Sequence, residues 1–145
     1  MHYASVIPLA PKSSPVAFSC SSKLQLESLL DNARKLSKGE DFVLLLNQNQ
    51  DSLLGRVLPS YINAYVRYKE DTLRSETLQI EILLFFAGTF KISEAIEECG
   101  ATDSAKFIMV ASSRVLAKRY ARVNKVELVK EHKLEISKDF IPAIE

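Results

Sequence analysis

Apolar residues recur at helical spacing in the middle of the chain. One set falls at the i, i+4, i+7 and i+8 positions of a single helix face: Leu78, Ile82, Phe85 and Phe86. Leu83 and Leu84 widen this face until the second half of the helix is apolar on nearly every side. A helix of that kind is surrounded by other elements. The pattern therefore predicts a buried helix at the centre of the core.

The ends of this helix, and a second short helix after it, are also marked. Thr72 or Ser75 can cap its start, and Gly88 can adopt the positive φ of a C-cap. The second helix carries an i, i+3, i+4, i+7 face: Ile92, Ala95, Ile96 and Cys99. Gly100 then stands where a C-cap belongs. We expect a buried helical hairpin over residues 74–100.

Strand and helix signals alternate in the rest of the chain. The strand candidates are short β-like or continuously apolar runs at residues 3–9, 16–20, 42–46, 106–111, 126–129 and 134–136. The further helix candidates have a period near 3.6 and lie at residues 22–36, 53–69 and 113–123. Ser22 and Gln25 have the capping-box form, and Pro59 starts or kinks its helix.

These elements predict an α+β fold. The run 42–46 is apolar throughout, which indicates a central strand covered on both faces, whereas 126–129 and 134–136 are expected at edges. Strands and helices mix without regular βαβ alternation. We therefore expect a two-layer α/β sandwich, with a mixed sheet packed against helices, in a single domain that spans residues 1–145.

Composition narrows the function classes. The 145 residues carry a net charge of +1, so the molecule as a whole has no strong attraction for nucleic acid or membrane. No run approaches the roughly 18 apolar residues of a membrane span, and the first residues do not have the form of a signal peptide. Cys20 and Cys99 are far apart in the sequence and are expected to be reduced, partly buried thiols. These features predict a cytoplasmic protein without a membrane partner.

Catalytic chemistry finds little support. His2 and His132 lie near opposite ends of the chain, and neither has a metal-ligand spacing. The sequence contains no glycine-rich phosphate loop and no nucleophile elbow. We expect no enzyme activity, no cofactor and no metal. Glu81 lies inside the apolar helix and needs a partner, for which nearby backbone or a basic residue is the ordinary candidate.

Two basic clusters stand out from the near-neutral average. The first combines Arg67, Lys69 and Arg74 with Tyr65 and Tyr68. The second contains Arg114, Lys118, Arg119, Arg122, Lys125, Lys130 and Lys133. A solvated helix face is the usual explanation for such a stripe of charge. Cations interleaved with aromatic rings are also what a single-stranded nucleic acid end requires.

The hairpin carries a family resemblance. Glu81-Ile82-Leu83, Gly88, the Ile92–Ile96 segment and Gly100, followed by an apolar strand, resemble the PRPK-binding (TPRKB-like) subunits of the KEOPS complex. The likeness covers residues 64–112, and the order of elements before it agrees. Many archaeal relatives have Arg-Gln where this chain has Phe90-Lys91, which leaves Lys91 to replace that arginine. The end of the chain soon after residue 136 is similar to the compact archaeal form.

The resemblance implies a subunit without catalysis. Such subunits bind the small kinase/ATPase of KEOPS, the assembly that makes threonylcarbamoyladenosine in tRNA, and archaeal relatives grip the single-stranded 3′ CCA end. The alternative is a pure protein-interaction or regulatory subunit of the kinase without RNA contact. The expected RNA-binding residues are Arg67, Lys69, Arg74, Lys91, Tyr68 and, in the competing Arg114–Lys118–Arg122 stripe, Lys118. The expected kinase-binding residues are the apolar Phe140, Ile141 and Ile144.

Overall fold

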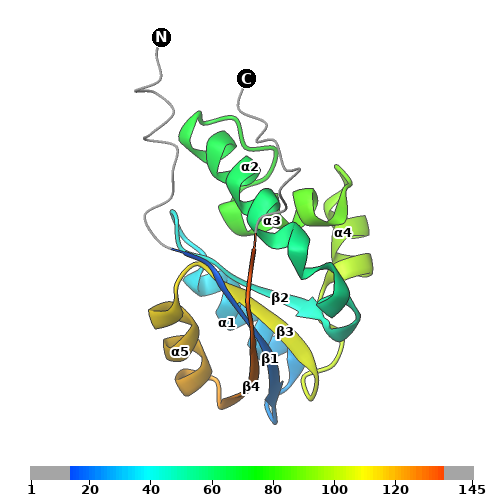
Figure 1. The fold of residues 1–145 in the computed structure, drawn as a ribbon, viewed down its shortest axis with the longest axis vertical. Helices are drawn as coiled ribbons and strands as arrows, with labels where there is room; N and C mark the ends of the chain where they lie inside the picture. Colours follow the sequence, from blue (N-terminus) through cyan, green and yellow to red (C-terminus); the bar gives the residue numbers. More distant parts are fainter. Residues whose placement is uncertain (1–13, 136–145) are drawn as a thin grey trace.

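A four-stranded antiparallel sheet runs through the middle of the protein (Figure 1). The computed structural model describes residues 14–135. The sheet order is β2-β3-β1-β4, with β1 at Val16–Ser22, β2 at Val43–Asn47, β3 at Phe107–Ala111 and β4 at Val126–His132. Each described pair of neighbouring strands is antiparallel, so the expectation of a mixed sheet was wrong.

Helices cover both faces of this sheet (Figure 1). The helices are α1 (Leu26–Leu36), α2 (Val57–Lys69), α3 (Leu78–Ala87), α4 (Ile92–Cys99) and α5 (Arg114–Val123), with a 3-10 segment η3 at Gln48–Arg56. One core lies between the sheet and α2, α3 and α4, and a second lies between the sheet and α1 and α5. The α+β sandwich is confirmed, but it has three layers rather than the expected two.

The two cores follow from side-chain alternation along the apolar strands. In β2, Leu44 and Leu46 belong to the core beneath α3, whereas Val43 and Leu45 belong to the core beneath α1. Successive side chains of a strand point to opposite faces, so a run that is apolar at every position is buried on both sides. This explains the uninterrupted apolar sequence of β2.

The same strand lies at an edge of the sheet, although its sequence predicted a central place. Neighbouring groups occupy its outer backbone atoms. Ser37 Oγ accepts a hydrogen bond from Val43 N (3.0 Å), and Gln79 Nε2 donates to Val43 O (2.6 Å). Ala101 N donates to Leu45 O (3.1 Å). An edge covered in this way is protected from pairing with another chain.

The helical hairpin forms as predicted, but the N-cap of α3 is a different residue. Thr77, rather than Thr72 or Ser75, accepts from Ile80 N at the start of α3. Gly88 has φ of 73° and ends α3 as expected. Gly100 is the C-cap of α4 as expected, and its N donates to Ile96 O (2.9 Å), but its φ of −66° is not left-handed. A Cβ there would lie 2.7 Å from the carbonyl oxygen of Ile96, and this close approach is what requires glycine.

Other local expectations divide between confirmation and correction. Ser22 ends β1 and does not cap α1, which begins at Leu26. The strand expected at 134–136 is not formed by Leu134 and Glu135, and residue 136 lies outside the described part of the chain. The strand expected at 3–9 also lies outside it. Both cysteines are free and buried, and burial raises the pKa of the Cys20 thiol to about 12.

Candidate nucleic-acid interface

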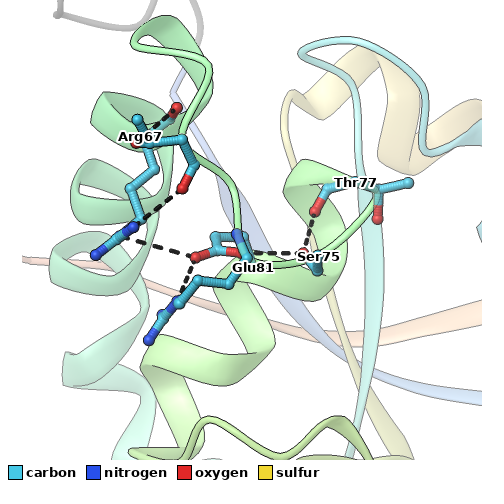
Figure 2. Close-up of polar contacts among 6 residues, drawn as sticks. Arg67, Ser75, Thr77 and Glu81 are labelled. Carbon is cyan, nitrogen blue, oxygen red and sulfur yellow. Dashed lines mark hydrogen bonds and ion pairs between the residues drawn. The ribbon is translucent and has the colours of Figure 1, made fainter.

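The site begins with a buried carboxylate in the first turn of α3. Glu81 has no exposed surface, and its Oε1 accepts from Arg74 N (2.9 Å) while its Oε2 accepts from Arg74 Nε (2.8 Å). Ser75 Oγ lies 3.0 Å from Oε1, and Arg67 Nε lies 3.9 Å from Oε2 (Figure 2). A buried charge needs such partners. The expectation that backbone and a basic residue satisfy Glu81 is confirmed.

The carboxylate holds the Arg74 guanidinium between two aromatic rings. The Arg74 Cζ atom lies 4.7 Å from the centroid of the Phe85 ring and 4.8 Å from that of Phe90. Arg67 approaches the same Phe85 ring at 6.0 Å and donates from Nη1 to Thr72 O (3.0 Å). Attraction between cations and ring faces adds to the ion pair in fixing this geometry.

Together these side chains border a hollow of about 340 Å³. Its lining joins the end of α2, the segment before α3 and the turn after α3: Arg67, Arg74, Leu84, Phe85, Gly88, Thr89 and Phe90. The left-handed Gly88 reverses the chain at the end of α3, and Phe90 two residues later reaches back over Arg74. The hollow therefore combines positive charge with an aromatic ring that is 79% exposed.

Only part of the first predicted cluster lines this hollow. Arg67 and Arg74 do, whereas Lys69 pairs with Glu40 (3.8 Å) and lies over the Tyr65 ring. Tyr68 packs beside Tyr65 and is partly buried against the core. Lys91 follows Phe90 directly and its exposed ammonium group lies 3.7 Å from Glu94.

The second basic stripe is on the other side of the sheet. Lys118 is an exposed residue of α5, the helix that packs on the face opposite α3. Arg114 is bound by Glu131 through two hydrogen bonds of 2.6 and 2.5 Å, and this contact lowers the pKa of Glu131. The hollow and the stripe are therefore separate surfaces.

The aromatic members of the hollow were not predicted as site residues. Phe85 matched the buried stripe of α3, but it is only partly buried and faces the two arginines. Phe90 was noted as a departure from relatives rather than as a contact residue. The position of Phe90 after the Gly88 turn and beside Lys91 was the sequence signal that could have identified it as a site residue. Phe140, Ile141 and Ile144 lie outside the described residues.

Residues 14–135 form neither a metal-binding cluster nor a membrane-spanning helix. No group of three or more metal-ligating side chains comes together in that range. Within the same range, no helix has both the length and the apolar character needed to cross a membrane.

Comparison with known proteins agrees with the resemblance seen in the sequence. No curated protein matches the chain. The family model described as "Kinase binding protein CGI-121" matches residues 54–144, which is well over half of the chain and includes all the residues that line the hollow. The chain therefore belongs to the CGI-121 family of kinase binding proteins.

Proposed function

We propose that this protein is a non-catalytic, cytoplasmic KEOPS subunit that supports threonylcarbamoyladenosine modification of tRNA. It binds the small kinase/ATPase of the complex, and it holds the single-stranded 3′ CCA end of tRNA in the hollow beside α3. The kinase partner is supported by the family to which the chain belongs. The observation that carries the RNA contact is the Arg74 guanidinium fixed between Phe85 and Phe90.

The hollow offers the two interactions that single strands use. Glu81 engages the Nε side of Arg74, and Thr72 O accepts from Arg67 Nη1. We assign the two terminal nitrogen atoms of Arg74 and Nη2 of Arg67 to phosphate oxygens. The exposed Phe90 ring supplies a face for a base, and Lys91 beside it supplies a further cation. Stacking of a base on an aromatic ring contributes about 1–3 kcal/mol. Lys69, Tyr68 and Lys118 lie outside the hollow, and we give them no contact with the CCA end.

The test compares two equally exposed apolar side chains. Phe90 and Val115 are each 79% exposed, but Val115 belongs to α5 on the opposite face of the sheet. We expect Phe90→Ala to weaken binding of intact tRNA by roughly 5- to 150-fold, the loss of one stacked base. Val115→Ala should bind like the parent, and tRNA without its CCA end should bind equally weakly to all three proteins.

Arg74 itself is a poor position for this test, because its substitution would also destabilise the fold. Any substitution there leaves the buried Glu81 carboxylate without its closest partner. Arg67→Gln and Lys91→Gln change the charge around the hollow with less effect on the core, since both side chains are partly or largely exposed. Parent-like binding by Phe90→Ala and by both of these variants would show that the CCA end is held elsewhere.

A regulatory subunit without RNA contact is the second candidate. The observation in its favour is that Glu81 already neutralises much of the charge that Arg74 brings to the hollow. For such a protein, removal of the CCA end from tRNA would change nothing, and kinase binding would be the whole of its function.

A further inference from the structure

A second hollow lies on another side of α3, at the outer edge of β2 where the two helical layers meet. It has a volume of about 240 Å³, and its lining is mostly apolar, with Leu30 of α1, Ile80 and Leu83 of α3 and Ile96 of α4 among its residues. On α3, Ile80 and Leu83 face this groove, whereas Phe85 faces the cationic hollow. The two surfaces therefore share α3 but no lining residue.

The groove continues into apolar surface that the fold leaves uncovered. The periodicity of α4 predicted one buried face, but only Ala95 and Cys99 of that face are buried. Ile92 is 41% exposed and Ile96 is 50% exposed, and Leu30 across the groove is 40% exposed. Large aliphatic side chains grouped in this way are typical of a surface that contacts another protein.

Carboxylates and one cation are present near this apolar surface. Glu97 is exposed on α4 next to Ile96, and Glu27 is exposed on α1 one turn before Leu30. Arg34, which pairs with Asp31, lines the groove itself. An apolar centre offers a phosphate backbone no partner, and Glu27 and Glu97 repel it, so a nucleic acid is the wrong occupant. A protein surface with an apolar centre and Lys or Arg around it is complementary.

We propose that this groove docks the kinase, with one large aliphatic or aromatic side chain of the kinase inserted between Leu30, Ile80 and Ile96. The inference rests on the kinase partner of the proposed function. The matched family segment, residues 54–144, contains α3 and α4 and therefore most of the exposed apolar surface. Because the tRNA hollow lies on a different side of α3, one molecule binds both partners at once.

The experiment measures binding of the full chain to the KEOPS kinase subunit of the same organism. Ile96→Glu places a charge at the centre of the groove, and we expect it to weaken kinase binding by about 30-fold or more. The matched control is Val129→Glu, at a 60% exposed position on the outer strand β4, which should bind like the parent. Both variants should bind tRNA like the parent.

A second variant keeps the result interpretable if Ile96→Glu fails to fold. Glu97→Lys leaves the apolar positions intact and reverses one charge beside the groove. It should weaken kinase binding, and the affinity of the variant should depend less on salt concentration than that of the parent. If both variants bound the kinase as strongly as the parent, the groove would not be the docking site. The same would follow if Ile141→Glu alone lost kinase binding. Absence of kinase binding by the parent protein would instead refute the proposed function.

Discussion

Glu81 shows how one residue couples the core to the surface. Its carboxylate is buried, yet it fixes a guanidinium that borders an open hollow, and that guanidinium positions the Phe90 ring. An acid inside an apolar helix predicted a partner from the sequence alone. The bidentate contact to both the backbone and the side chain of Arg74 depends on the turn before α3, which periodicity does not describe.

The buried pair predicts unequal effects of removing two neighbouring cations. Arg74→Ala leaves the buried Glu81 carboxylate without its closest partner, and we expect the free energy of unfolding to fall by about 3–5 kcal/mol. Lys69→Ala removes a surface pair with Glu40 and should cost less than about 1 kcal/mol. Urea unfolding of the two variants measures the difference, and similar midpoints would contradict a structural role for the Arg74–Glu81 pair.

Sequence proximity was a poor guide to which residues share a site. Arg67 and Lys69 are two positions apart on α2, where residues two apart point in different directions. Arg67 reaches the hollow, and Lys69 turns toward Glu40. The cluster of charge was recognised correctly, but its division between two surfaces depends on how α2 packs against α3.

At the scale of elements, periodicity predicted the helices and most of the strands. It could not predict strand order, because a run such as β2 reports that both faces are covered and not how many neighbours it has. Nor could it distinguish Thr77 from Ser75 as the cap of α3, since both are suitable residues. The third layer was missed although β2 carried its signal, because a strand that is covered on both faces has a layer of helices on each side.

The central place of α3 predicts a large penalty for shortening its core side chains. Phe86 is 1% exposed, and Phe86→Ala should lower the free energy of unfolding by about 3–5 kcal/mol through lost burial and the cavity left behind. Phe90→Ala removes the same atoms from an exposed position and should stay within about 1 kcal/mol of the parent. Thermal melting compares the two, and equal shifts would argue against α3 as the centre of the core.

At the scale of the molecule, a net charge of +1 conceals surfaces of different character. The hollow beside Phe90 is cationic, whereas the groove beside Ile96 is mostly apolar, with Arg34 in its lining and Glu27 and Glu97 on the helices that border it. The charges cancel in the sum, so attraction of RNA over long distances is weak and binding depends on local contacts.

Local contacts predict a shallow salt dependence for tRNA binding. Three cations, Arg67, Arg74 and Lys91, give a slope of about −2 in log affinity against log salt concentration, at about 0.7 per phosphate on a single strand. Lys91→Gln should flatten the slope by about 0.7. Phe90→Ala should lower the affinity and leave the slope unchanged. Titration over a series of salt concentrations measures both, and a much steeper parent slope would implicate the α5 stripe as well.

The burial of both native cysteines has a practical consequence for following assembly. Cys20 and Cys99 are the two thiols of the sequence, and burial holds the pKa of each above its usual range. Thiol-reactive dyes act on exposed thiolates, so the native chain should label slowly. A cysteine placed at an exposed position beside the hollow or beside the groove, with Phe90 and Ile96 left intact, would carry a fluorophore to one chosen surface without removal of the native pair. Each partner's arrival could then be timed separately in the same solution.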